Sequence, residues 1–232
     1  MLYFRGCTAR EKLTSIQDAT EKLLKLAGVD YHVLDEEKCC GSVLLRTGFL
    51  KEAKEQIEKN TEILKGETII TSCAGCYKTL TEDYEGLDVI HISQLLSQLI
   101  SENKLKLSKK DLKVTYHDSC HLGRHKNVFD EPRSVISAVG DIVEMQNIRE
   151  NSLCCGAGGG VKSAYPEIAN QMANSRITQA KEIGCELLIT SCPFCKLNLE
   201  NEEIDVVDLT EFLVEYGDVD ETQWTWNNEK FI

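Results

Sequence analysis

The chain has 232 residues, of which 42% are hydrophobic, enough for one large or two modest domains with a buried core. Its net charge of −12 argues against binding to nucleic acid or to anionic membranes. No stretch approaches the roughly 18 consecutive apolar residues of a membrane span, and the opening residues lack the pattern of a signal peptide. We therefore expect a cytoplasmic protein, a compartment in which thiols stay reduced and structural disulfides are rare.

The first half of the chain alternates short apolar runs with helical patterns. Apolar residues recur at helical spacing over residues 17–27, and Gly28 then ends the pattern. In chain order the pattern predicts a strand at 2–4, a helix at 17–27, a strand at 31–34, a helix at 49–64, a strand from 68 that leads into a Cys-x-x-Cys turn, and a strand from 88 followed by a helix with Ser93 as its N-cap.

The second half repeats this order of elements. Residues 187–195 read LLITSCPFC where residues 68–76 read TIITSCAGC, and residues 205–213 match residues 88–96. The pattern predicts a strand at 114–116, a helix at 133–139, a strand at 142–145, a helix at 167–183, a strand leading into the second Cys-x-x-Cys turn, and a strand from 205 followed by a helix with Thr210 as its N-cap.

Strands that alternate with helices imply an α/β fold of two repeated Rossmann-like domains, each with a parallel sheet. The cysteines of each repeat then lie on loops at the carboxyl ends of strands, where open α/β sheets place their sites. A polar, lysine-rich stretch over residues 102–111 separates the repeats. We predict a first domain at 1–110 and a second at 111–232, the latter including a C-terminal tail.

Ten of the eleven cysteines fall into two equivalent sets of five. Each set consists of one lone cysteine, a Cys-Cys-Gly sequence and a Cys-x-x-Cys pair; the sets are Cys7, Cys39, Cys40, Cys73 and Cys76, and Cys120, Cys154, Cys155, Cys192 and Cys195. Thiolates are the preferred ligands of iron–sulfur clusters and soft metals, so metal or cluster ligation is the leading interpretation of both sets. The eleventh, Cys185, has no counterpart and is expected to be a small buried residue.

Five thiols per set exceed the four that structural zinc or a cubane cluster requires. Either the five hold a larger or more open cluster, or four bind and one stays free for chemistry. Consecutive cysteines can serve two irons of one cluster if the glycine after them lets the chain turn closely against it. The spacing is thus consistent with one multinuclear iron–sulfur cluster per half, and a zinc site in one half is the alternative.

Three further sequence matches accompany the cysteines: Phe4–Thr8 reads FRGCT, Tyr116–His125 reads YHDSCHLGRH and Leu153–Gly160 reads LCCGAGGG. With the cysteine frame, they make the chain resemble the Cys-Cys-Gly (CCG) domain family over residues 2–213. Its archetypes are the B subunit of heterodisulfide reductase and the carboxy-terminal part of the D subunit. Relatives occur in complexes that oxidise glycolate, lactate and glycerol-3-phosphate.

The resemblance implies two noncubane [4Fe-4S] clusters, each on one five-cysteine set. In heterodisulfide reductases such clusters receive electrons singly and split a disulfide held between them. Glycines of the Cys-Cys-Gly loops would allow close backbone approach to the cofactor; these are Gly41, Gly156, Gly158 and Gly159. The first half departs from the family because it lacks the glycine run of the second. No ferredoxin-type cysteine run is present, so the resemblance implies a ferredoxin-like iron–sulfur partner subunit, and a flavoprotein subunit is a further candidate.

Basic residues flank Cys120 closely. They can supply protons or neutralise thiolate charge at a disulfide bound between the halves, and we predict this catalytic role for His121, Arg124 and His125. The alternative for this cluster, which also includes His117, is hydrogen bonding to cluster sulfurs or to the backbone. His91, at a strand end, is expected to be structural. Outside the repeat, the aromatic tail with Trp224 and Trp226 is a candidate partner contact.

Three functions compete on these residues. The first is an oxidoreductase subunit, resembling heterodisulfide reductase, that reduces a small-molecule disulfide or oxidises thiols at cysteine-bound clusters. The second is an electron-relay subunit of a glycolate, lactate or glycerol-3-phosphate dehydrogenase-type complex. The third is a zinc-binding scaffold without a redox role.

Overall fold

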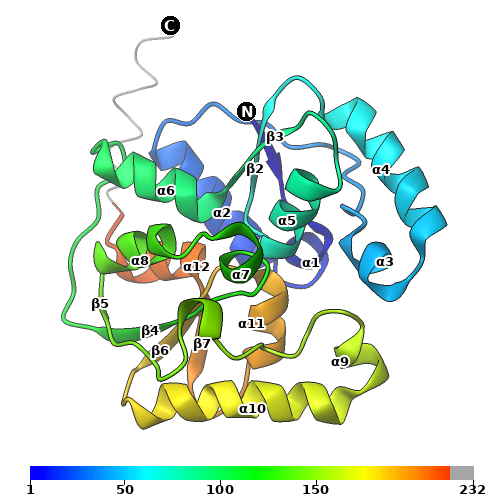
Figure 1. Cartoon of the computed structure of the whole chain (residues 1–232). Coiled ribbons are helices and arrows are strands. Elements are labelled where there is room, and N and C mark those ends of the chain that lie inside the picture. Colours follow the sequence, from blue (N-terminus) through cyan, green and yellow to red (C-terminus); the bar gives the residue numbers. More distant parts are fainter. Residues whose placement is uncertain (220–232) are drawn as a thin grey trace, which may run out of the picture.

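Two parallel β-sheets, one from each half of the chain, organise the molecule (Figure 1). The computed structural model describes residues 1–219, and the tail that carries Trp224 and Trp226 lies outside them. The first sheet has the order β1-β2-β3, with β1 at Leu2–Phe4, β2 at Thr68–Thr71 and β3 at Asp88–His91. The second has the order β5-β4-β6-β7, with β4 at Lys113–His117, β5 at Asp141–Ile142, β6 at Leu187–Thr190 and β7 at Asp205–Asp208. Every strand pair is parallel, which confirms the predicted fold class.

The helices follow the strands in the same order in both halves. Those of the first half are α1 (Cys7–Glu11), α2 (Thr14–Leu26), α3 (Ser42–Thr47), α4 (Leu50–Leu64), α5 (Ala74–Glu82) and α6 (Ile92–Ser101). Those of the second are α7 (Gly123–Lys126), α8 (Asp130–Ser137), the short 3₁₀ helix η1 (Arg149–Asn151), α9 (Val161–Ala164), α10 (Pro166–Glu182), α11 (Pro193–Leu199) and α12 (Leu209–Tyr216). None of the helices within residues 1–219 is long and apolar enough to cross a membrane.

Four helices lie between the two sheets and form a core that both halves share (Figure 1). Helix α2 packs on α12, and α6 packs on α8, so each pair has one helix from each half. In the repeat, α2 corresponds to α8 and α6 to α12. Leu23, Leu24 and Phe212 are fully buried there, and burial of such a side chain contributes about 1.5–3 kcal/mol. Each sheet takes its strands from one side of residue 110, as expected, but the division at 1–110 and 111–232 stays a prediction.

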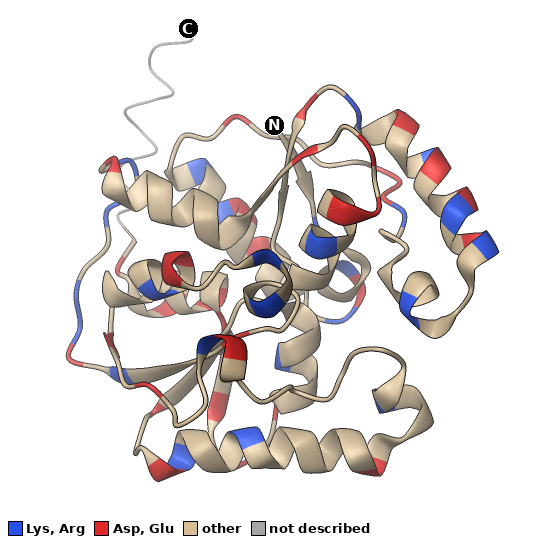
Figure 2. Ribbon diagram, in the orientation of Figure 1, with Lys and Arg blue, Asp and Glu red and all other residues tan. Residues whose placement is uncertain are grey.

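Helix α4, on the outside of the molecule (Figure 1), is mostly exposed, in contrast to the four helices of the shared core. Figure 2 shows acidic and basic residues side by side along α4, where Lys51, Glu55 and Lys59 are exposed. Only one stripe of α4 faces inward, and it buries Ala53, Asn60 and Leu64. This distribution is typical of a helix with one face on the sheet and the rest in water.

Three predicted details differ from the structure. The strand expected at 31–34 is a single bridge from His32 to Leu2, and β5 stops at Ile142. Both segments lie at the edge of a sheet, next to β1 and β4 respectively, and have a neighbour on one side only, which leaves them fewer ladder hydrogen bonds. The N-caps of α6 and α12 are His91 and Asp208, not Ser93 and Thr210, because these residues accept the hydrogen bond from the backbone N–H two residues on.

The cap of α12 has an unusual carboxyl group, from which we predict a pH effect on stability. Burial raises the pKa of Asp208 to about 7 from a usual value near 4. Between about pH 4 and pH 7 the folded chain therefore holds a proton that the unfolded chain releases, so the free energy of unfolding falls as the pH rises through this window. Asp208→Asn keeps the cap and removes the titration. We expect urea denaturation of this variant at pH 5 and pH 8 to show a smaller loss of stability than the parent chain.

The matched control is Asp205→Asn, at the exposed start of the same strand, β7. It should leave the pH dependence of the parent chain unchanged. If Asp208→Asn and the parent chain lose equal stability between pH 5 and pH 8, the carboxyl of Asp208 is ionised throughout that range.

Candidate metal centre

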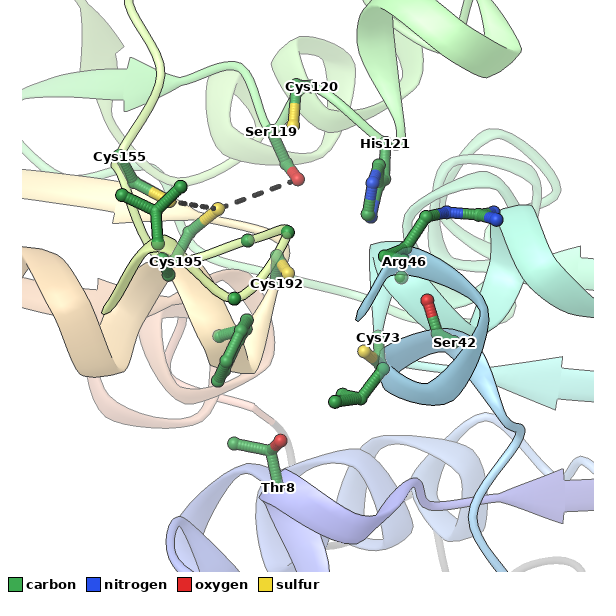
Figure 3. A pocket seen from close by; sticks show the side chains of 18 of the residues that line it. Thr8, Ser42, Arg46, Cys73, Ser119, Cys120, His121, Cys155, Cys192 and Cys195 are labelled. Carbon is green, nitrogen blue, oxygen red and sulfur yellow. Dashed lines mark hydrogen bonds between the residues drawn. The ribbon is translucent and has the colours of Figure 1, made fainter. Parts of the chain in front are cut away.

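One cavity of about 600 Å³ lies where the carboxyl ends of the two sheets meet. All ten cysteines of the two predicted sets line it, five from each half. Figure 3 shows Cys155, Cys192 and Cys195 across the cavity from Cys73. Sequence spacing predicted two equivalent sets, and the tertiary structure brings them to a single space. Among the described residues Cys185 is the cysteine that does not line it; this residue lies just before β6 and is partly exposed.

The two Cys-x-x-Cys pairs sit at the amino-terminal ends of helices. Cys73 is the N-cap of α5 and Cys192 is the N-cap of α11. Each of these cysteines stands two residues after the end of a buried strand, and Cys76 and Cys195 lie in the first helical turn. A helix amino terminus favours negative charge, so this placement suits thiolates.

The sulfur atoms lie close to one another within each set. The Sγ atoms of Cys7 and Cys39 are 3.9 Å apart, and those of Cys155 and Cys195 are 3.3 Å apart. A hydrogen bond from Cys120 raises its own pKa and lowers the pKa of Cys154 to about 2, because the shared proton stays on one sulfur. Because neighbouring thiolates repel each other, only some cysteines of such a set ionise without a metal. A cation that binds several thiolates at once removes this repulsion.

The two sets also contact each other. A hydrogen bond to Cys192 is the main cause that raises the pKa of Cys73, and these two cysteines belong to different halves. Ser42 and Thr8 of the first half and Ser119 of the second line the same space (Figure 3). The cavity is therefore one site with contributions from both repeats.

The glycine of each Cys-Cys-Gly sequence is required by the backbone. Gly41 and Gly156 have φ values of +84° and +87°, which glycine adopts at little cost. A Cβ atom on Gly156 would also lie 2.7 Å from the carbonyl oxygen of Ala169 in α10. The N–H groups of both glycines point back at a cysteine of their own set, Gly41 N to Cys39 Sγ at 3.5 Å and Gly156 N to Cys154 Sγ at 3.4 Å.

Side-chain hydrogen bonds hold the Cys-Cys backbone in both halves. In the first half the Tyr84 hydroxyl donates to the carbonyl of Cys40 at 3.0 Å. In the second half the Asn198 amide donates to the carbonyl of Cys155 at 2.5 Å. A tyrosine in one half and an asparagine in the other thus satisfy the equivalent buried carbonyl group beside the cysteines.

The predicted glycine residues divide into two groups. Gly158 and Gly159 line the cavity, whereas Gly41 and Gly156 pack behind the cysteines toward α4 and α10. The glycine run ends at Gly160, where an added Cβ would lie 3.2 Å from Thr47 of α3. The run therefore lets the loop of the second half approach α3 of the first, and α3 is built from the segment in which the first half lacks glycines.

The predicted catalytic residues are not all at the cavity. His121 lines it, and burial lowers the pKa of this imidazole, which favours the neutral ring. Arg124 and His125 are exposed and do not line it. The guanidinium of Arg124 donates to the carbonyl oxygen of Ser152 at 2.6 Å and so holds the loop before Cys154. The His125 ring lies 5.4 Å from that of His121, centre to centre.

The cavity also holds residues that sequence reasoning missed. Arg46 brings a positive charge from α3, and Val43 and Tyr165, one from each half, are exposed at its wall. The side chain of Arg46 is anchored by Asp83, 3.2 Å away. The only sequence signal was position, because Val43 and Arg46 follow the first Cys-Cys-Gly directly and Tyr165 follows the glycine run of the second.

Fully buried His117 lies behind the second set. Its Nε2 atom has no hydrogen-bond partner among the described residues, and a ring nitrogen lies within 4.8 Å of the sulfurs of Cys155 and Cys195. Burial lowers the pKa of His117 to about 3, so the ring is neutral. A donor set of thiols, backed by a buried ring nitrogen without a partner among the described residues, fits a sulfur-ligated metal centre.

Comparisons with known proteins agree with this site. The sequence model of a family described as "CCG: Cysteine-rich domain" matches residues 1–81 and 114–200. The chain is 40% identical to the D subunit of dihydromethanophenazine:CoB–CoM heterodisulfide reductase from Methanosarcina acetivorans, over 86% of the chain and 53% of that protein. It is 34% identical to the B subunit of fumarate reductase (CoM/CoB) from Methanothermobacter marburgensis, over 91% of the chain and 45% of that protein.

A third similarity is to the EtfAB:quinone oxidoreductase of Syntrophomonas wolfei, at 33% identity over 84% of the chain and 30% of that protein. The chain thus spans about half the length of the first two relatives and less of the third. What it shares with all three is a stretch that covers most of its own residues.

Proposed function

The chain belongs to the cysteine-rich CCG domain family, and on that premise we propose that it is an iron–sulfur redox subunit of an oxidoreductase complex. It binds one cluster of the noncubane [4Fe-4S] type on each five-cysteine set and reduces a small-molecule disulfide, or oxidises the corresponding thiols, between them. The observation that carries the proposal is the single cavity lined by all ten cysteines of the frame. Five thiols per set exceed the four ligands of a closed zinc site, which disfavours the zinc scaffold.

A disulfide fits the stoichiometry of the cavity. Its reduction takes two electrons and two protons, breaks the S–S bond and releases two thiols. Bound clusters would supply the electrons, one from each set. The neutral ring of His121, on the cavity wall, can relay a proton from solvent to a departing thiolate, because it takes up a proton at one nitrogen as it gives one from the other, and Arg46 can offset the charge of the thiolate. Val43 and Tyr165 offer apolar contact to the carbon chain of the substrate.

The electrons come from a partner in this proposal. The names of the relatives as reductase subunits support a multi-subunit complex. A ferredoxin-like iron–sulfur subunit, itself served by a flavoprotein, is the electron donor we propose, in the cytoplasm. Arg124 and His125 lie outside the cavity and beside the loop that carries Cys120 and His121. Their proposed role is therefore to position that loop and not to contact the substrate.

A pure electron relay is the second candidate. The similarity to an EtfAB:quinone oxidoreductase favours it, because the name of that protein includes no disulfide. A relay passes electrons between protein partners and needs no substrate in the cavity. The two functions are therefore separated by whether a disulfide can reoxidise the reduced protein by itself.

The test begins with anaerobic isolation and analysis of iron, acid-labile sulfide and zinc. The protein is then reduced with dithionite, freed of excess reductant and mixed with disulfides of different charge, and cluster absorbance is followed by stopped flow. Rapid reoxidation by one class of disulfide supports the catalytic role. Reoxidation by a quinone or an electron-transfer protein alone supports the relay, and stoichiometric zinc without iron overturns both.

Replacement of His121 by alanine should separate catalysis from cluster binding. Because general acid–base catalysis contributes about 10²–10⁴-fold, we expect reoxidation by the cognate disulfide to slow by at least about 10²-fold at unchanged iron content. His125→Ala is the comparison variant and should slow reoxidation much less, since this exposed histidine lies one helical turn away and does not line the cavity. Equal rates for the parent chain and His121→Ala would show that the imidazole is structural.

A further inference from the structure

The side chains behind the second cysteine set determine where the proton of His117 sits. Arg176, which is fully buried, donates from Nε to Nδ1 of His117 at 3.2 Å. The same guanidinium donates to the carbonyl oxygens of Asn147 at 2.7 Å and Tyr116 at 3.3 Å, so its orientation is fixed. A guanidinium has donors only; Nδ1 must therefore accept, and the neutral ring carries its proton on Nε2.

This tautomer makes His117 a hydrogen-bond donor and not a ligand. A metal-bound histidine ligates through one nitrogen and donates a proton through the other. In His117 the far nitrogen accepts from Arg176, so Nε2 keeps its proton. That N–H is buried without a partner among residues 1–219. A nitrogen of this ring lies within 4.8 Å of the sulfurs of Cys155 and Cys195, and because Nδ1 is taken by Arg176, these sulfurs are the acceptors assigned to Nε2.

A second side chain adds to this arrangement. The Oγ atom of Ser119 lies 3.6 Å from Sγ of Cys195 (Figure 3). A ligating cysteine has lost its proton, so in a loaded site the hydroxyl of Ser119 is the donor. The thiolates of the second set thus face two side-chain donors, one from the end of β4 and one from the loop that follows it.

The first set has neither of these two donors, and its own hydroxyl contact is that of Thr8 with Cys7. Counted from the lone cysteine of each repeat, Phe4 stands where His117 stands, and Gly6 stands where Ser119 stands. In α4, Asn60 takes the helical position that Arg176 takes in α10, and it donates to the carbonyl of Cys39 instead. The backbone N–H groups of Gly41 and Gly156 serve both sets alike. The difference between the sets therefore comes from side chains.

We propose that His117 and Ser119 donate hydrogen bonds to the cysteine thiolates of the second set, so that a cluster there is reduced at a higher potential than one in the first half. Hydrogen bonds to the sulfurs offset the negative charge that reduction adds, and they are one of the means by which proteins set cluster potentials. Electrons that enter the cavity then collect at the second half. This inference rests on the proposed function, because it requires clusters at both sets.

The test is a potentiometric titration of the whole chain followed by EPR, with His117→Phe and Ser119→Ala as the variants. His117→Phe installs the residue of the first half. We expect one of the two midpoint potentials to fall in each variant while the other stays in place. In protein labelled with ¹⁵N-histidine, pulsed EPR should show a nitrogen coupling on the affected signal that is lost in His117→Phe. Ser119→Ala is the smaller change and serves if His117→Phe fails to fold.

The matched control is Ser152→Ala, which removes another buried serine hydroxyl two residues from a cysteine. That hydroxyl lies against the carbonyl of Leu153 and not against a sulfur, so both midpoints should stay in place. Unchanged midpoints in iron-loaded Ser119→Ala and His117→Phe would overturn this inference and leave the proposed function intact. A parent chain without iron would overturn the proposed function and, with it, this inference.

Discussion

Replacement of Cys155 by serine is expected to remove the iron of the second half and to leave that of the first. Two clusters of the proposed type amount to about eight irons per chain, so the content should fall to about four. Cys155 is buried, its sulfur lies 3.3 Å from that of Cys195, and a serine hydroxyl is a poor substitute for a soft thiolate ligand. Iron and acid-labile sulfide, measured after anaerobic isolation, check the result.

The loss should also loosen the loop that carries the ligands. Where a site does not exist in the unfolded chain, the free energy of metal binding is part of the free energy of folding. We expect limited proteolysis of Cys155→Ser to cut within residues 154–162, a segment that the loaded parent chain protects. Cys40→Ser is the matched variant for the first half, and Cys185→Ser, outside the cavity, is the control that should keep all of the iron. Full iron content in both Cys155→Ser and Cys40→Ser would mean that the consecutive cysteines are not required ligands.

Replacement of Gly156 by alanine is expected to be the most damaging of the glycine changes around the site. The residue has a φ of +87°, and an added Cβ would lie 2.7 Å from the carbonyl oxygen of Ala169, a backbone atom that cannot move without α10. The strained φ alone costs about 1–2 kcal/mol. The clash adds to it and displaces Cys155, so both thermal stability and iron content should drop.

Two other glycines separate the causes of this loss. Gly41→Ala has nearly the same φ, +84°, but its nearest neighbours are 3.9 Å or more away, so it should show the cost of strain without the clash. Gly158→Ala meets no protein atom within 4 Å and should keep the thermal stability of the parent chain, whereas a loss of iron in this variant would place a cluster against the loop. Thermal unfolding and iron analysis of the three variants check the order. Equal effects of Gly41→Ala and Gly156→Ala would show that α10 yields to the added methyl group.

The sequence alone was sufficient for the repeat, the fold class and the ten cysteines. Alternation of apolar runs and helical periodicity depends on local contacts, so strands such as Thr68–Thr71 and helices such as α10 could be predicted from nearby residues. Segments that depend on a neighbour were predicted less well: residues 31–34 form a single bridge, and the caps of α6 and α12 are the residues that end the strands before them. The cysteine spacing repeats in both halves, so the two sets could be recognised without any knowledge of the tertiary structure.

Only the tertiary structure decided how the two repeats meet. The pairing of α2 with α12 and of α6 with α8 turns the carboxyl ends of both sheets toward one cavity, and no local pattern encodes that pairing. It brings Cys73 against Cys192 and Gly160 against Thr47, and it leaves His121 inside and Arg124 outside. The sequence also could not predict the hydrogen-bond partner of His117, since Arg176 lies 59 residues further along the chain. Contacts between distant segments follow from how complementary surfaces pack, and a linear sequence of residues does not show which surfaces will meet.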